Sequence, residues 1–311
     1  MKAVVVDRSA PGGLTIRDVS DPAALPSEAL VRVAAISLNR GEVRRAKNAQ
    51  NGWRPGWDIA GTIERAAADG SGPPAGSRVV GLATASGGWA ERVAIPTRDL
   101  AVLPDTVSFE RAATLPVAGL TALYALEKRG SLLGRRVLVT GASGGVGVFA
   151  LQLARLSGAY AVGLVHQERK REIVARFADV IVEGETAEPA TQYGPFDTIL
   201  ESVGGQVFST ALALLAQSGI LVTYGTSAQS SSTIEVAPFY SRGASAIYGF
   251  FIFYELERGE PAGLGLARLL RLVDTGPLDV HVDEIAPFAR IAESVERLWQ
   301  RDIAGKLVLT L

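Results

Sequence analysis

The sequence predicts an α/β protein that combines a β-rich, barrel-like domain with a doubly wound parallel sheet. Two patterns carry this prediction. Short β-favouring runs separated by Gly and Pro fill the first third of the chain, and strands alternate with helices from about residue 108 onward. The length of 311 residues is enough for two domains, each with its own core.

Five short runs in the first hundred residues favour β-strands. Gly- and Pro-rich segments such as 11–13 and 70–74 separate them and favour turns. Because few long helical patterns interrupt these runs, we expect an antiparallel or barrel-like sheet. The runs are residues 3–6, 29–33, 62–66, 78–82 and 90–95.

Helical patterns then join the strands. Ser108 is a candidate helix start, and residues 120–128 have helical apolar spacing. Alternation of strands and helices further on predicts a parallel sheet covered by helices. The expected strands are 136–139, 160–165, 180–182, 198–200, 220–222 and 246–253, and the expected helices are 146–156, 167–177 and 207–215. The tail predicts helices at 264–273 and 289–299, a strand near His281 and a closing strand at 306–311.

Composition excludes several classes of function. A net charge of -1 gives no overall field that draws the chain to nucleic acid or to an anionic membrane. The absence of cysteine excludes disulfides, thiol nucleophiles and thiolate-held metals, and the two histidines are too few for a histidine-rich metal site. The apolar run at 3–6 is too short for a signal-peptide core or a membrane span, so we expect a cytoplasmic protein.

The most informative stretch is a glycine-rich turn between an apolar strand and a helix, at residues 136–147. Such a turn places backbone N–H groups and the positive end of a helix against a dinucleotide pyrophosphate. Gly144 lets the phosphate approach closely, and Gly147 lets the helix pack on the strand, although Ala142 replaces the first glycine of the common fingerprint. We therefore expect dinucleotide binding by Gly144, Gly145, Val146 and Gly147.

The same turn also fits the short-chain dehydrogenases, because Tyr124 and Lys128 supply a Tyr-x-x-x-Lys pair. In that family the pair follows the glycine turn by well over a hundred residues. Here the pair precedes the turn. We interpret Tyr124 and Lys128 as one face of a helix.

The cofactor class depends on the residue that ends the second strand of the sheet, where a carboxylate selects NAD. Counting roughly 20 residues past the turn reaches His166. No carboxylate stands there, and the cations Arg169, Lys170 and Arg171 follow, which favours the 2′-phosphate of NADPH. Two alternatives stay open: the cations solvate a helix, and His166 is an ordinary strand-end residue.

Six sequence blocks, in one order along the chain, resemble the medium-chain dehydrogenases/reductases in their zinc-free quinone oxidoreductase branch. The resemblance covers essentially the whole chain and implies a GroES-like β-barrel catalytic domain and a Rossmann domain. It implies the domain boundaries 1–118, 119–257 and 258–311, with the last segment returning to the catalytic domain. The blocks are residues 37–42, 55–61, 115–122, 141–147, 202–205 and 305–309.

The resemblance also implies roles for individual residues. Asn39 and Thr121 are the expected catalytic residues, and Lys170 is expected at the 2′-phosphate. His166 stands where the family usually has Ser or Thr. The other expected cofactor-binding residues are Arg169, Val203, Gly225, Phe250 and Lys306.

The departures from the wider superfamily decide the expected chemistry. The cysteine and histidine ligands of a catalytic zinc are missing, so no Lewis acid is available to polarise an alcohol or a carbonyl, and we expect no metal site. Hydride transfer to a quinone, an enone or an enoyl thioester remains, with Asn39, Thr121 or backbone N–H groups stabilising the oxyanion. Some enoyl reductases of the superfamily that this chain resembles place a tyrosine proton donor shortly after the Asn39 segment. No tyrosine lies between Arg45 and Gly52 here, so solvent is the expected proton source.

The sequence also bears on assembly and on an alternative function. The apolar run 246–253 at the sheet edge favours a homodimer, because exposed edge strands invite pairing. The absence of a clear general acid leaves a second function class open, a non-catalytic NADPH-binding redox sensor or partner protein.

Overall fold

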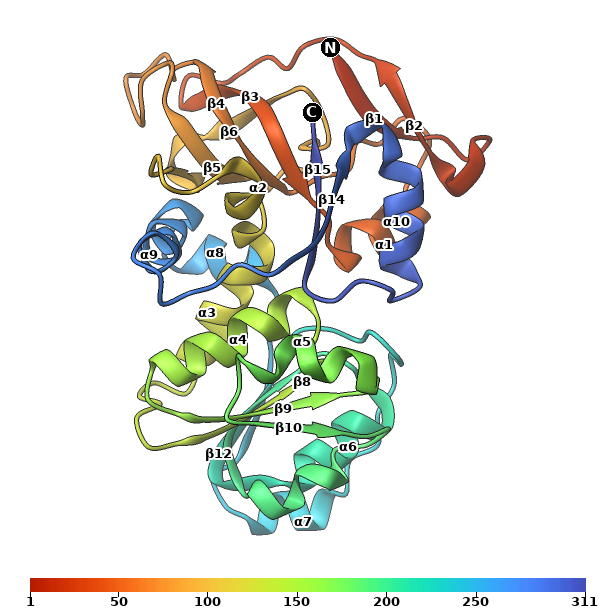
Figure 1. The fold of residues 1–311 in the computed structure, drawn as a ribbon, viewed down its shortest axis with the longest axis vertical. Coiled ribbons are helices and arrows are strands. Elements are labelled where there is room, and N and C mark those ends of the chain that lie inside the picture. Colours follow the sequence, from red (N-terminus) through yellow and green to blue (C-terminus); the bar gives the residue numbers. More distant parts are fainter. The chain divides into compact units, whose positions relative to one another are not determined.

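The computed structural model describes residues 1–311, apart from the side chain of Pro11. The chain forms two compact units: Met1–Leu120 with Leu256–Leu311, and Thr121–Glu255. The first is the GroES-like unit and the second is the Rossmann unit (Figure 1). Helices α3 (Leu120–Glu127) and α8 (Ile252–Arg258) run across the divisions.

The GroES-like unit is built from both ends of the chain. Its main sheet has the order β14-β15-β3-β4-β5-β7, with β6 paired to β3, and β1 pairs with β2 in a separate hairpin. The last strand, β15, runs antiparallel to β3, with Val308 opposite Ser37 (Figure 1). The strands are β1 (Lys2–Val6), β2 (Leu14–Asp18), β3 (Glu28–Ser37), β4 (Asp58–Arg65), β5 (Arg78–Leu82), β6 (Arg92–Pro96), β7 (Leu100–Val102), β14 (Val282–Pro287) and β15 (Lys306–Thr310). The helices are α1 (Arg40–Asn48), α2 (Phe109–Ala112), α9 (Ala262–Asp274) and α10 (Ile291–Trp299), and a π-helical turn, η3, spans Leu115–Gly119.

The core of this unit explains why these runs become strands. Ile36, Ile59, Trp89 and Ile95 are fully buried and face one cluster of apolar side chains. β-branched residues fit a pleated, half-buried surface, so the short β-favouring runs bury their apolar faces here. β3 and β4 pair antiparallel with a local irregularity next to Gly61, and a Cβ on Gly61 would lie only 2.1 Å from the carbonyl oxygen of Arg32, so this position requires glycine.

The Rossmann unit is a six-stranded sheet in the order β10-β9-β8-β11-β12-β13, with every pairing parallel. The first strand of this unit, β8, lies in the middle of the sheet. The next strands are added on one side of β8 and the later strands on the other, so the strand order reverses between β8 and β11. Parallel α/β sheets bind their ligands at such a point. The strands are β8 (Arg136–Thr140), β9 (Tyr160–Val165), β10 (Val180–Glu183), β11 (Phe196–Glu201), β12 (Leu215–Thr223) and β13 (Ala246–Gly249). The helices are α4 (Gly145–Leu156), α5 (Arg171–Ala175), α6 (Gly205–Ala213) and α7 (Val236–Ser241).

Three expected elements were wrong in extent. The strand expected over 246–253 ends at Gly249, and residues from Ile252 belong to α8. Phe250 and Ile252 are buried whereas Phe251 is 61% exposed, because the chain turns after the strand instead of continuing along the edge. A continuous apolar run does not distinguish a strand from a helix, which explains the error.

Two expected helices were also wrong in extent. The helix expected over 167–177 is a 3-10 turn, Glu168–Lys170, followed by the short α5. The helix expected over 207–215 ends at Ala213, and Leu215 already begins β12.

Among the residues that the structure describes, no helix is both long enough and apolar enough to cross a membrane.

Candidate functional site

The glycine turn lies at the carboxyl end of β8, next to the point where the strand order of the sheet reverses. Gly141 has a φ of +58°, which favours glycine, and Gly144 is the N-cap of α4. A Cβ on Gly147 would lie 2.6 Å from the carbonyl oxygen of Gly141. Only a glycine lets the first turn of α4 approach the backbone of the preceding turn so closely.

The N-terminus of α4 is suited to an anion. No side chain caps this 12-residue helix. The first N–H groups of a helix lack partners within the helix and carry its positive partial charge. A dinucleotide pyrophosphate fits this turn, because the glycines leave the space that a Cβ would fill and the first-turn N–H groups of Gly145, Val146 and Gly147 are available to it.

A buried carboxylate, Glu201, shapes the neighbouring loop at the end of β11. Its Oε1 accepts hydrogen bonds from the backbone N–H groups of Val203 (2.7 Å) and Gly204 (2.8 Å). Burial raises the pKa of Glu201, and these hydrogen bonds oppose the rise. A Cβ on Gly225 would lie 3.2 Å from the carbonyl oxygen of Ser202 in the same loop. Val203 and Gly225 thus both lie beside Ser202, next to the glycine turn. The sequence did not predict the role of Glu201, which holds the Val203 end of this loop.

The residues expected at the 2′-phosphate differ in how far their side chains are exposed to solvent. His166 is 57% exposed, and its Nδ1 lies 3.3 Å from Oε1 of Glu185, a carboxylate that the sequence reading did not bring to this edge. Arg169 is exposed and its Nε donates to Gln167 (3.3 Å). Lys170 is only 8% exposed. His166 and Arg169, rather than Lys170, present their side chains to solvent here.

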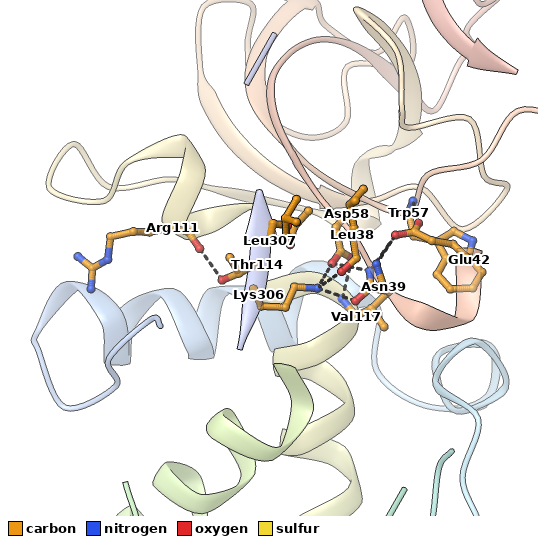
Figure 2. Close-up of polar contacts among 11 residues, drawn as sticks. Leu38, Asn39, Glu42, Trp57, Asp58, Arg111, Thr114, Val117, Lys306 and Leu307 are labelled. Atoms are coloured by element: carbon orange, nitrogen blue, oxygen red, sulfur yellow. Dashed lines mark hydrogen bonds and ion pairs between the residues drawn. The ribbon is translucent and has the colours of Figure 1, made fainter. Parts of the chain in front are cut away.

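In the GroES-like unit, four side chains form what we call the polar cluster: Asn39, Glu42, Asp58 and Lys306 (Figure 2). The Lys306 ammonium donates to the Leu38 carbonyl (3.0 Å), to Oδ1 of Asn39 (2.6 Å) and to Oδ2 of Asp58 (3.2 Å). All three of its N–H donors are therefore used. The side chain of Lys306 is 3% exposed and that of Asp58 is fully buried.

These contacts fix the orientation of the Asn39 amide. Its Oδ1 accepts from the Lys306 ammonium, and its Nδ2 donates to Oδ2 of Asp58 (2.8 Å). The reverse orientation would place an amide NH2 group against an ammonium and an amide oxygen against a carboxylate. The second amide N–H is held more weakly, 3.3 Å from Oε1 of Glu42.

Glu42 and Asp58 also bind backbone groups. Glu42 accepts from the N–H groups of Asn39 (2.6 Å) and Trp57 (2.9 Å), so it completes one half of a capping box at the start of α1. Asp58 accepts from the N–H of Val117 (2.9 Å), which lies in the first turn of η3. The spacing Asn39-x-x-Glu42 was a signal for the capping role, but nothing local indicated the contact between Asp58 and Val117.

The charges of the polar cluster are unequal, with two carboxylates facing one ammonium. Burial raises the pKa of Glu42 well above its usual range, the charge of Asp58 raises it further, and Lys306 opposes both effects. Burial raises the pKa of Asp58 as well, against the opposing effects of Lys306, Asn39 and Val117. Lys306 is therefore the one charged group that opposes the rise in the pKa of both carboxyls.

The remaining expected residues lie in the Rossmann unit. Thr121 is 5% exposed in the first turn of α3. Phe250 is also 5% exposed, and its N–H donates to the carbonyl of Thr223 (2.8 Å). Asn39 and Lys306 share one site in the GroES-like unit, while Val203 and Gly225 share another in the Rossmann unit.

No group of three or more His, Cys, Asp or Glu side chains that could hold a metal ion occurs among the described residues. The carboxylates of the polar cluster accept hydrogen bonds from Asn39, Trp57, Val117 and Lys306. These hydrogen bonds occupy carboxylate oxygens that would otherwise be free to coordinate a cation.

We predict that Lys306→Met lowers the free energy of unfolding by about 3–5 kcal/mol near pH 7, because it leaves buried carboxylates uncompensated. A carboxyl with a raised pKa stabilises the fold below its unfolded pKa, and this contribution is lost as pH rises through the folded pKa. The deficit should therefore shrink as the pH is lowered from about 8 to about 5. Denaturant unfolding at several pH values measures it.

Two variants control this experiment. Adding Asp58→Asn to Lys306→Met removes one uncompensated charge and should recover part of the lost stability. Lys2→Met removes a lysine from an exposed ion pair with Asp18 (2.6 Å) and should change stability little. If Lys306→Met loses little free energy of unfolding, or if the loss grows as the pH falls, Lys306 is not the countercharge of the buried carboxylates.

Comparison with known proteins agrees with this architecture. A model of the alcohol dehydrogenase GroES-like domain matches residues 25–105, and a zinc-binding dehydrogenase model matches residues 145–262. The quinone oxidoreductase-like protein 2 of Bos taurus is 25% identical over 96% of this chain and 89% of its own length. The acryloyl-coenzyme A reductase of Sulfurisphaera tokodaii is 28% identical over 72% of this chain and 77% of its own length.

Similarity extends to a larger protein and to solved structures. The highly reducing polyketide synthase apmlA of Arthrinium phaeospermum is 31% identical over 85% of this chain, which spans only 11% of that protein. A mycobacterial protein solved in complex with NADPH has a TM-score of 0.89 and 25% identity over the full length of both chains. The quinone oxidoreductase of Coxiella burnetii has a TM-score of 0.83 and 25% identity, covering 100% of this chain and 99% of that one. With its GroES-like and Rossmann units, the chain belongs to the medium-chain dehydrogenase/reductase superfamily, in the quinone oxidoreductase branch.

Proposed function

We propose that this chain is an NADPH-dependent reductase that transfers hydride to a conjugated acceptor, a quinone, an enone or an enoyl compound, without zinc. The observation that carries the proposal is the polar cluster, in which an ammonium and a carboxylate orient an amide and which contains no thiolate or imidazole. The nucleotide-binding turn supports it, as does similarity to a quinone oxidoreductase-like protein and an acryloyl-coenzyme A reductase.

The Rossmann unit supplies the residues that would hold NADPH. The first-turn N–H groups of α4 suit the pyrophosphate, and the loop that carries Val203, together with Gly225, lies beside them. The exposed cation Arg169 suits the 2′-phosphate, and His166 lies at the same edge. The nicotinamide of the bound cofactor supplies the hydride.

Asn39 is the residue that we propose acts on the acceptor. Lys306 and Asp58 fix the plane and the orientation of its amide, which avoids reorganisation when charge develops. The N–H that is held only at 3.3 Å by Glu42 is the donor that we assign to the acceptor oxygen. Glu42 already accepts a shorter hydrogen bond from the backbone N–H of Asn39 (2.6 Å), so the loss of this weak contact costs little.

The chemistry of the site favours acceptors that spread charge by conjugation. The sequence contains no cysteine and only two histidines, so it lacks the usual ligands of a Lewis acid that would stabilise an alkoxide. No tyrosine lies between Asn39 and Gly52, and we propose that solvent supplies the proton. We further propose a homodimer that pairs along the outer edge of the short β13, with the exposed Phe251 beside the strand.

We predict that NADPH binds more tightly than NADH and that Arg169→Ala reduces this preference. The physical reason is the loss of a charge-assisted hydrogen bond, each of which contributes about 1.5–3 kcal/mol. Fluorescence titration of both cofactors measures the preference. Arg155→Ala, at the other end of α4, is the control and should leave it unchanged. Equal affinity of the wild type for NADPH and NADH would sink this assignment.

We predict oxidation of NADPH with quinones or α,β-unsaturated carbonyl compounds and no oxidation of simple alcohols. Asn39→Ala should lower turnover by about 10²–10³ because one oxyanion donor is lost, with a smaller effect on NADPH binding. Thr121→Ala should also lower turnover more than binding. Asn48→Ala, near the end of the same helix α1, is the matched control. Steady-state kinetics over a panel of acceptors provides the measurement.

Each outcome discriminates between functions. Robust alcohol oxidation would overturn the proposed mechanism. Tight NADPH binding without turnover on any conjugated acceptor would favour the redox-sensor function instead.

A further inference from the structure

Arg54 is a half-buried cation in the loop between α1 and β4. Its Nε is shielded from solvent, and none of the described residues accepts a hydrogen bond from it. Burial lowers the pKa of Arg54, without a contribution from any charged neighbour. A shielded guanidinium nitrogen without an acceptor costs stability, so such a group calls for a ligand or a function.

Other arginines of the same unit show what a purely structural arginine does here. Nη1 of Arg40 donates to the carbonyl of Leu298 (2.8 Å) at the end of α10, although its Nε, like that of Arg54, has no acceptor among the described residues. Arg78 donates to the carbonyls of Pro104 (2.9 Å) and Val107 (2.7 Å). Both fasten one segment of the chain to another. For Arg54, by contrast, the part of the chain that the structure describes shows no hydrogen bond that fastens one segment to another, and its Nε has no acceptor there.

The loop that carries Arg54 is held firmly by its backbone. The carbonyl of Pro55 accepts from the N–H of Trp89 (3.1 Å), and the carbonyl of Gly56 accepts from the N–H of Gly88 (3.0 Å). A Cβ on Gly87 would lie 4.0 Å from Nε and Nη2 of Arg54, so the guanidinium lies against this glycine. The guanidinium therefore lies near a glycine of the segment to which its own loop is tied.

The same loop is connected to the polar cluster. Trp57 donates through its backbone N–H to Glu42 (2.9 Å) and through Nε1 to the hydroxyl of Ser86 (3.1 Å). Ser86 precedes Gly87, against which Arg54 lies. Hydrogen bonds thus connect the polar cluster to Ser86, whose neighbour Gly87 lies beside the Arg54 guanidinium.

We propose that Arg54 binds a carboxylate carried by the conjugated acceptor, so that the substrate class is an acidic enone or quinone. A guanidinium matches a carboxylate because its planar fork donates two parallel hydrogen bonds. The proposal rests on the reductase function proposed above, and it adds an anionic group to the acceptor. Arg54 then determines which acceptors are favoured, while Asn39 acts on the reacting end.

The test compares 6-oxohept-4-enoate with its methyl ester. Two methylene groups separate the carboxyl from the enone, so the two compounds share one enone and differ mainly in charge. The wild type is expected to reduce the acid with a kcat/KM about 10- to 100-fold higher than that of the ester. Arg54→Ala should remove this preference and leave the rate with the ester nearly unchanged. Arg54→Lys should retain an intermediate preference, because a lysine keeps the charge but loses the fork.

Arg65→Ala, which removes an exposed arginine from β4 of the same unit, is the matched control and should keep the preference. Thermal unfolding of each variant checks the fold, and Arg54→Lys decides the question if Arg54→Ala does not fold. An absent preference in the wild type, or one that survives in Arg54→Ala, overturns the proposal.

A binding measurement separates this proposal from the reductase function. If the wild type reduces neither compound, the reductase function fails. Calorimetric titration with the acid then still tests Arg54. Binding to the wild type that is lost in Arg54→Ala supports a carboxylate site, and equal binding to both proteins refutes it.

Discussion

The buried ammonium of Lys306 joins the last strand of the GroES-like unit to its third strand and to the start of α1. It donates to the Leu38 carbonyl, Asn39 and Asp58, and the Leu38 N–H in turn donates to the carbonyl of Leu307 (3.1 Å). Because Asn39 takes its amide orientation from Lys306 and Asp58, the proposed donor to substrate depends on a lysine near the end of the chain. Removing the ammonium would leave two buried carboxylates without a countercharge, so the arrangement is hard to change one residue at a time.

Each unit uses a buried carboxylate to hold backbone N–H groups next to its site. Glu42 does so for Asn39 and Trp57, and Glu201 does so for Val203 and Gly204. A carboxylate that accepts several N–H donors offsets the cost of its burial and fixes the loop that it binds. Preorganised loops suit hydride transfer, in which the protein supplies orientation and electrostatics more than chemistry.

Sequence reasoning succeeded where the signal was local. The turn at Gly144 and Gly147 could be predicted because a strand, a glycine turn and a helix follow one another directly. The polar cluster could not, because its contacts span 15 residues from Glu42 to Trp57, 59 from Asp58 to Val117 and 267 from Asn39 to Lys306. The apolar run after Gly249 was ambiguous between strand and helix, and neither the burial of Lys170 nor the approach of Glu185 to His166 is written in any short motif.

The central claim, hydride transfer to carbon without zinc, is tested most directly by isotope transfer with metal-depleted protein. Protein whose zinc content is far below one per chain is incubated with NADPH that carries deuterium at the transferable C4 position and with an enone. We expect mass spectrometry to find one deuterium on the β-carbon of the product, at a rate that added zinc does not change. A product without the label, or a rate that rises in proportion to added zinc, would contradict the account.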